Sequence, residues 1–247
     1  MEYKIADYFG YKMYEFEFMG RQAMLVFPKA PNNHKPWLLK TEYFWAFPTF
    51  EKEMLKKGYY LAYISNKTRW HDDSDDDVKH NFSLFLQEEF GLLNKCLPVG
   101  MSCGGMHAIY FGAKYPSDVI GLYLDAPVVN LLSCPFGIGI GRCESKNEFI
   151  DHKGLSLSDL LTFREHPQDY IHHLTENHIP VFLICGDSDD IVPYTENGKI
   201  VFDHYIKQNA DIRLIIKEGC NHHPHGLDDP TPLVEWAERL FKEYCYA

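Results

Sequence analysis

The sequence predicts an α/β fold in which a mostly parallel, eight-stranded sheet is flanked by helices. Two observations lead to this fold class. Short apolar runs alternate with amphipathic stretches along the chain, which is the pattern of parallel strands joined by crossover helices. The 247 residues have the usual length of one such domain, and no internal repeat or low-complexity linker divides them. We therefore predict a single domain over residues 1–247.

The first two strands of this sheet are expected to form an antiparallel pair. Tyr14, Phe16 and Phe18 alternate with two glutamates, which is the period of a half-buried strand. The turn-forming residues 19–21 then lead into a second strand at 23–27. The other expected strands span residues 36–40, 59–64, 96–99, 119–124, 181–185 and 212–216.

Helices are expected between and after these strands. Val78, Phe82, Phe85 and Leu86 are spaced so that they form one apolar helical face, which we interpret as core packing. The remaining helices are expected at residues 50–57, 104–114, 194–208 and 232–242.

One long segment, 130–180, interrupts the alternation between the sixth and seventh expected strands. It contains three glycines within residues 137–141 and then continues into mixed helical patterns. Because it is short for a domain and is bracketed by two core strands, we predict that it forms a cap over the site and not an independent unit.

Charge and cysteine content exclude several classes of protein. The formal net charge of -11 argues against a nucleic-acid partner and against binding to an anionic membrane, since both require a basic surface. The N-terminus has no basic start followed by an apolar run, and no apolar stretch approaches the ~20 residues of a membrane span. The seven cysteines include no CxxC pair. We expect a cytoplasmic protein with reduced cysteines, no metal and no cofactor, and the pattern favours no particular oligomeric state.

The sharpest motif is G-x-S-x-G at residues 100–104, directly between an expected strand and an expected helix. In this setting the serine sits on a tight, strained turn, and small residues two positions before and after it let the chains pass closely. The turn pushes the hydroxyl of Ser102 out of the sheet edge and aims the N–H of Cys103 at the oxygen of a bound carbonyl. We predict Ser102 as the nucleophile and Cys103 as one oxyanion donor.

A serine nucleophile needs a base and an acid, and in this fold the acid precedes the histidine in the chain. Three aspartates follow the apolar strand 181–185. We assign the acid to Asp189 because it lies in the loop beyond the strand, four residues before Pro193. Asp187 and Asp190 remain alternatives with structural roles, the first in the turn and the second as a helix cap.

Three histidines within four positions follow the last expected strand. His222 comes three residues after Gly219, which places it on the loop that faces the nucleophile, and we assign it as the base. His223 is kept in reserve for the same role. The additional histidines are expected to line the pocket or to pack structurally.

The second oxyanion donor should come from the loop after the third strand. We predict the backbone N–H of Thr41 or of Glu42 for this role. The His-Gly pair that is usual at this corner is not found here.

The chain resembles the α/β-hydrolase superfamily over nearly its whole length, with Ser102, Asp189 and His222 at the triad positions of that fold. Four segments also resemble a group of small prolyl-oligopeptidase-like hydrolases often associated with carbohydrate esterases: residues 35–37, 100–105, 125–128 and 222–232. The resemblance implies an esterase that acts on acyl groups, including those on sugars. It departs from the group at residues 40–42, where an arginine-containing segment is expected.

These observations predict a serine hydrolase that cleaves a carboxylic ester of a small molecule, either a small acyl ester or an acylated sugar. The same triad also fits a peptidase, an amidase or an acyltransferase, since all of them pass through an acyl-enzyme. A non-catalytic binding protein on the hydrolase scaffold is the third hypothesis, because a fold does not fix a function. The intact set of three residues argues against it.

Overall fold

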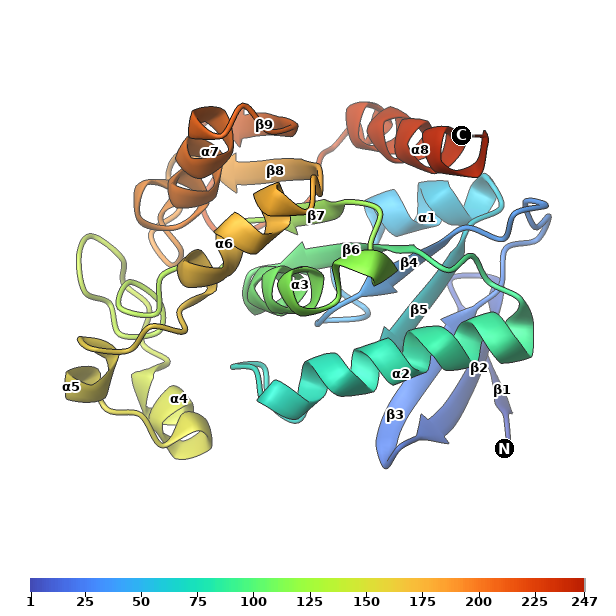
Figure 1. The fold of residues 1–247 in the computed structure, drawn as a ribbon, viewed down its shortest axis with the longest axis horizontal. Helices are drawn as coiled ribbons and strands as arrows, with labels where there is room; N and C mark the ends of the chain where they lie inside the picture. The colour runs from blue at the N-terminus through green and yellow to red at the C-terminus, as the bar shows by residue number, and fades with distance from the viewer. Residues whose placement is uncertain (247) are drawn as a thin grey trace.

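A continuous sheet runs through residues 1–246, the part of the chain that the computed structural model describes (Figure 1). In these residues nine strands follow the spatial order β1-β2-β3-β5-β4-β6-β7-β8-β9. The strands are β1 (Lys4–Tyr8), β2 (Tyr11–Phe18), β3 (Arg21–Val26), β4 (Trp37–Lys40), β5 (Tyr60–Ile64), β6 (Cys96–Met101), β7 (Leu122–Asp125), β8 (Val181–Gly186) and β9 (Ile212–Lys217).

The sheet is parallel from β5 across to β9 and antiparallel at its other end, where β1, β2, β3 and β5 pair in succession. The α/β class and the antiparallel opening pair are therefore confirmed. The predicted count of eight strands is wrong, because β1 was not expected. Only Tyr8 of its five residues is buried, so its sequence shows no apolar alternation. The segment 130–180 consequently lies between the seventh and eighth strands.

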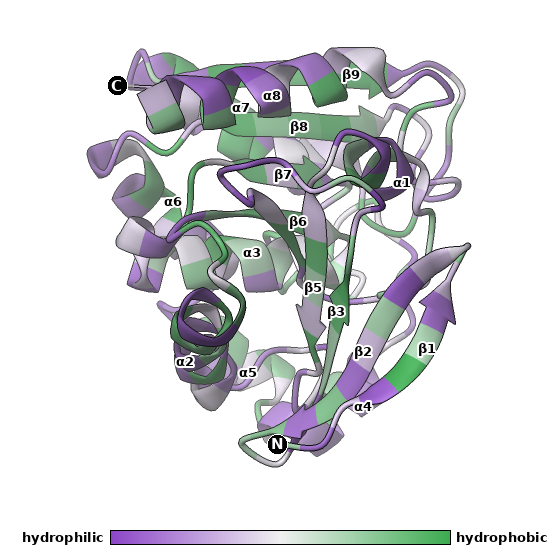
Figure 2. Cartoon of the chain, turned by 90° about the vertical axis from the view of Figure 1, so that its right-hand side faces the viewer, coloured by the Kyte–Doolittle hydropathy of each residue, from purple (hydrophilic) through white to green (hydrophobic). Residues whose placement is uncertain are grey.

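Helices cover both faces of the sheet (Figures 1 and 2). One face packs against α1 (Thr49–Lys56) and α8 (Thr231–Tyr246). The other packs against α2 (Asp73–Phe90), α3 (Cys103–Lys114), α6 (Pro167–Glu176) and α7 (Gly198–Lys207). Neighbouring residues of β4 serve opposite faces, since Leu38 joins the first core and Leu39 the second. None of the helices in residues 1–246 is both long enough and apolar enough to cross a membrane.

The helix expected at 194–208 is interrupted at Asn197. A short 3-10 turn, η2 (Tyr194–Glu196), precedes α7, and Asn197 between them has φ of -133° and ψ of -87°. The side-chain oxygen of this buried asparagine accepts hydrogen bonds from the N–H groups of Val129 and Asn130, both at 3.0 Å. At this interruption between η2 and α7, the side chain of Asn197 thus fixes the loop that follows β7 by two hydrogen bonds.

The segment 130–180 contains α4 (Lys146–Lys153), α5 (Leu157–Leu160) and α6. Helix α6 packs against α3, whereas α4 and α5 project beyond the carboxyl ends of the parallel strands (Figure 1). Phe149 of α4 and Leu160 of α5 join a third apolar cluster that includes Trp70, Met106 and Tyr110. This cluster fixes the projecting part beside the start of α3, where the nucleophile motif lies.

Candidate active site

Ser102 occupies the turn between β6 and α3, with φ of 53° and ψ of -120°. Residues other than glycine rarely adopt a positive φ. The N–H of Ser102 donates to the carbonyl of Asp125 at 2.9 Å, and the carbonyl of Ser102 accepts from the N–H of Val128 at 3.0 Å. Hydrogen bonds to the end of β7 and the loop after it thus hold the strained backbone in place.

The glycines around Ser102 are required because two chain segments pass too closely for a side chain. A Cβ atom on Gly100 would lie 2.6 Å from the carbonyl oxygen of Gly104. A Cβ on Gly105 would lie 2.4 Å from the Cβ of Pro127. The tight strand-to-helix turn therefore depends on steric space on both sides of the serine.

The structure brings Ser102, His222 and Asp189 together at the carboxyl ends of the strands. The Nε2 atom of His222 lies 3.1 Å from the Oγ of Ser102, and its Nδ1 atom lies 2.8 Å from the Oδ2 of Asp189. Because a carboxylate only accepts hydrogen bonds, Nδ1 carries the hydrogen and Nε2 presents a lone pair to the serine hydroxyl. This is the arrangement in which an imidazole can accept the proton of a serine.

Backbone groups hold Asp189 in the orientation that the histidine requires. Its Oδ1 accepts hydrogen bonds from the N–H groups of Ile191 at 2.9 Å and Val192 at 2.8 Å. Burial acts to raise the pKa of Asp189, but the hydrogen bonds from His222, Val192 and Ile191 outweigh it and hold the pKa below its ordinary value. The carboxylate is therefore ionised at neutral pH.

The two alternative aspartates lie elsewhere. Asp187 accepts the N–H of Gly219 at 2.8 Å, which joins the turn after β8 to the turn after β9. This is the structural role expected of it. Asp190 does not cap a helix, because α7 begins only after Asn197. Its backbone carbonyl accepts the N–H of Arg142 at 2.6 Å instead.

The reserve candidate His223 does not contact the serine in the way that His222 does. Its ring is exposed and stacks on Phe47, with ring centroids 5.4 Å apart and an interplanar angle of 17°. Burial and the neighbouring rings of His222 and His225 lower the pKa of His223. It lines the cavity beside the nucleophile.

A second histidine–carboxylate pair, which the sequence did not reveal, lies next to the first. The Nδ1 of buried His225 is 2.8 Å from the Oδ1 of Asp125. The other carboxylate oxygen accepts the N–H of Gly226 at 2.6 Å and the hydroxyl of Tyr123 at 2.8 Å. The sequence signals for this pair are an aspartate at the end of the apolar strand β7 and an additional histidine after the last strand.

The predicted oxyanion donors have different outcomes. Cys103 is the first residue of α3, so its N–H has no acceptor within the helix and is available at the helix N-terminus. Thr41 is wrong as a donor, because its N–H already donates to the carbonyl of Val99 at 3.2 Å and continues the pairing of β4 with β6. The backbone nitrogen of Glu42 lies near the start of α3, 3.4 Å from a Cβ placed on Gly104.

Ser102 and His222 line a cavity of about 550 Å³. The wall includes Arg69, whose Nε donates to the Oε1 of Glu148 on α4 at 2.7 Å. The other lining residues are Tyr43, Ala46, Phe47, Trp70, Met101, Cys103, Cys134, Cys143, Ser145, Ile191, His223 and His225. The cavity is thus formed jointly by strand ends, by the loop before α2 and by the segment 130–180.

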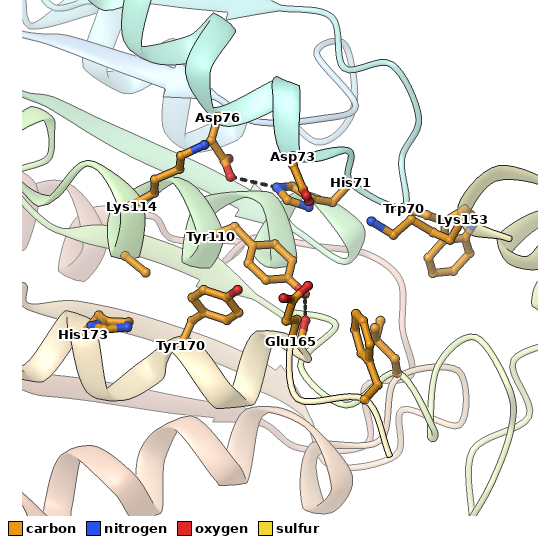
Figure 3. Close-up of a pocket in the computed structure, with 13 residues that line it drawn as sticks. Trp70, His71, Asp73, Asp76, Tyr110, Lys114, Lys153, Glu165, Tyr170 and His173 are labelled. Carbon is orange, nitrogen blue, oxygen red and sulfur yellow. Dashed lines mark hydrogen bonds and ion pairs between the residues drawn. The ribbon is translucent and has the colours of Figure 1, made fainter. Parts of the chain in front are cut away.

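A second cavity, of about 310 Å³, shares Trp70 with the first (Figure 3). It contains a His71–Asp76 pair, with Nε2 and Oδ2 2.8 Å apart, and the ring of His71 stacks on Tyr110. The residues that line it include neither serine nor cysteine. Ser102 lines the larger cavity and not this one.

The histidines beside Ser102 form one of two groups in the described residues that could hold a metal ion; the other is His172, His173 and Glu176. One ring nitrogen from each of His222, His223 and His225 lies within 4.8 Å of the others. Histidine nitrogens at such spacing suit zinc and related ions. The absence of a metal from the reaction stays a prediction.

Comparisons with known proteins bear on the fold. No family model matches the sequence. The puromycin-hydrolyzing peptidase of Mycobacterium tuberculosis superposes with a TM-score of 0.70 at 12% identity, over 96% of this chain and 38% of that one. Dipeptidyl peptidase 4 of Porphyromonas gingivalis gives 0.65 at 15% identity, over 98% and 35%. The acylaminoacyl peptidase of Pyrococcus horikoshii gives 0.66 at 14% identity, over 89% and 37%.

The chain spans little more than a third of the length of these peptidases. The likeness covers nearly all of this chain, and it agrees with the strand order and with the strand–turn–helix geometry around Ser102. The chain has the α/β-hydrolase fold.

Proposed function

We propose that the protein is a serine hydrolase that cleaves a carboxylic ester, with a small acyl ester or an acylated sugar as substrate. The observation that carries this proposal is the contact of His222 with both Ser102 and Asp189 at a strained turn that opens into a cavity. The resemblances described above to esterases and to structures of hydrolytic peptidases support the same class of chemistry.

The proposed mechanism follows from the positions of these atoms. His222 accepts the proton of Ser102 as the serine oxygen attacks the acyl carbonyl, and it returns that proton to the leaving group. Asp189 keeps the imidazole oriented and stabilises its charged form. The N–H of Cys103 stabilises the developing oxyanion, and one such donor typically contributes roughly 3 kcal/mol. Water then repeats the sequence on the acyl-enzyme.

The charge of the cavity favours a neutral acyl ester over a substrate with a free amino terminus. Among the described residues, the lining of this cavity includes Arg69 and three histidines but no aspartate or glutamate. An ammonium group buried there would find no carboxylate to pair with, which makes its desolvation unfavourable. Amide hydrolysis remains the second candidate, because several of the solved structures that match are peptidases.

The proposal is tested with a panel of p-nitrophenyl esters, acetylated sugars and aminoacyl amides on the wild type and on Ser102→Ala. We expect ester turnover by the wild type and a loss of at least about 10⁴-fold in kcat for the variant, as nucleophile deletions show. Comparable turnover by both proteins would refute the role of Ser102. A fluorophosphonate probe that leaves Ser102 of the wild type unlabelled would favour the non-catalytic binding protein.

A further inference from the structure

Two thiols lie in contact in the wall of the larger cavity. The Sγ atoms of Cys134 and Cys143 are 3.1 Å apart, and both residues line the cavity with Ser102. Both are free cysteines in this structure. The triad chemistry uses neither of them, so their contact calls for a separate explanation.

The two sulfur atoms have different environments. Cys134 is buried, with 3% of its surface exposed, whereas Cys143 is partly exposed. The hydrogen bond from the thiol of Cys134 lowers the pKa of Cys143 to about 6, and the same contact together with burial raises the pKa of Cys134. Cys143 is therefore the more readily ionised thiol of the two, and Cys134 the one that holds its proton. A nucleophilic thiolate beside a second cysteine is the arrangement found in redox-active pairs.

The backbone between the two cysteines can accommodate a bond between them. A disulfide requires the sulfurs to be about 2.05 Å apart, so they must approach by roughly 1 Å. The intervening loop includes Gly137 and Gly139, both with positive φ, which only glycine adopts without strain. Hydrogen bonds from Ile140 to Glu196 and from Arg142 to Asp190 attach the loop at other points. These hydrogen bonds hold the loop that carries Cys143 next to Cys134.

We propose that Cys134 and Cys143 form a reversible disulfide in the wall of the cavity, with hydrogen peroxide as the oxidant. The thiolate of Cys143 attacks one peroxide oxygen and the O–O bond breaks. This gives a sulfenic acid and hydroxide, which takes up a proton to become water. The sulfur of Cys134 then displaces the hydroxyl group from the sulfenic sulfur, and that group leaves as a second water with the thiol proton. Two thiols are oxidised by two electrons, and a dithiol reductant reverses the change.

The formation of this bond does not depend on the proposed function, and its test needs no substrate. The full chain is treated with hydrogen peroxide and digested with trypsin. Cleavage after Arg142 separates the two cysteines into the peptides 115–142 and 143–146, each of which holds one cysteine. We expect the two peptides to appear linked, two hydrogens lighter than their sum, and to separate after treatment with dithiothreitol. Two of the seven thiols should be lost in parallel.

Three variants make the test specific. In Cys134→Ser we expect Cys143 to stop at the sulfenic acid and to be trapped by dimedone, whereas in Cys143→Ser the thiol of Cys134 should persist. Cys245→Ser removes a distant, partly exposed cysteine of α8 and should form the link as the wild type does. The proposal is overturned if wild-type Cys134 and Cys143 remain thiols under peroxide that oxidises Cys220. The wild-type measurement decides the matter even if a variant fails to fold.

Discussion

Two histidine–carboxylate pairs lie side by side at the edge of the sheet, with the rings of His222 and His225 4.9 Å apart. Both histidines bond to a buried aspartate through Nδ1. Only His222 places its other nitrogen against a serine. The pairs therefore have the same chemistry but different partners, and this difference assigns the proton transfer to His222 and a structural role to His225.

Substitution of the two neighbouring histidines distinguishes the base from its reserve. We expect His222→Ala to lower kcat/KM for p-nitrophenyl acetate by at least about 10⁴-fold, because Ser102 loses its proton acceptor. His223→Ala should retain activity within about tenfold, since its exposed ring stacks on Phe47 and general base catalysis rests with its neighbour. An active His222→Ala together with an inactive His223→Ala would transfer the role to His223.

Removal of Asp125 should destabilise the fold more than removal of an exposed aspartate. In Asp125→Ala the buried donors of His225, Gly226 and Tyr123 lose their acceptor. We expect the free energy of unfolding in urea at pH 7 to fall by about 3–5 kcal/mol, the usual effect of breaking a buried pair. Asp187→Ala is the control. It also loses a bond to a backbone N–H, but in an exposed turn, and should cost about 1 kcal/mol. Equal losses would contradict a buried, structural role for Asp125.

At the scale of elements, the nucleophile turn is the point where β6, α3 and the end of β7 fit together most tightly. Gly105 of α3 lies against Pro127, which follows β7. In an open helix, replacing glycine by alanine favours folding by up to about 1 kcal/mol. At Gly105 the steric overlap makes the same substitution unfavourable for folding, because there is no room for the added carbon.

We expect Gly105→Ala to lower the free energy of unfolding by about 2 kcal/mol or more, because overpacking typically costs 1–3 kcal/mol. Displacement of α3 from Pro127 should also slow the labelling of Ser102 by a fluorophosphonate. Gly154→Ala is a matched control. Gly154 ends α4 with a φ of +66° and has nothing within 4 Å of its Cβ position. An alanine there therefore adds backbone strain of about 1 kcal/mol without steric overlap. Wild-type stability and labelling for Gly105→Ala would contradict the packing argument.

The elements differ in how well their sequences predict them. Buried strands and the G-x-S-x-G turn are local patterns, so the parallel part of the sheet and the position of Ser102 were predictable. The edge strand β1 was not, because it buries only Tyr8. The N–H of Thr41 is occupied because it bonds to Val99 of β6, and the contact of His225 with Asp125 joins residues far apart in the chain. Such contacts arise when whole elements pack together, so the spacing of residues along the sequence does not reveal them.

At the scale of the whole molecule, two buried carboxylates attach the C-terminal part of the chain to the sheet. Asp125 ends β7 and bonds to His225 and Gly226, while Asp189 follows β8 and bonds to His222. The chain then continues into α8, which covers one face of the sheet. For Asp125, burial alone would raise the pKa, but the hydrogen bonds from His225, Gly226 and Tyr123 lower it. Its ionised form is therefore part of what holds the fold together.

Acid should weaken this attachment, whereas protonation of carboxyl groups without such partners removes no folded-state interaction. A carboxyl whose pKa is lower in the folded than in the unfolded protein stabilises the fold above its unfolded value, here 3.8. That contribution is lost as the pH falls below 3.8 toward the lower folded value, because the unfolded chain then binds more protons. We expect the wild-type free energy of unfolding, measured in urea from pH 7 to pH 3, to decline mainly below about pH 4.

The variant Asp125→Asn isolates the part of this decline that belongs to Asp125. It should be less stable than the wild type at pH 7, since the ionic partner of His225 is gone, and it should lose less stability between pH 5 and pH 3. Asp151→Asn, an exposed substitution on α4, serves as the control and should follow the wild-type curve. If Asp125→Asn and the wild type decline in parallel, the acid sensitivity arises from other carboxyl groups and not from the attachment of the C-terminal segment at β7.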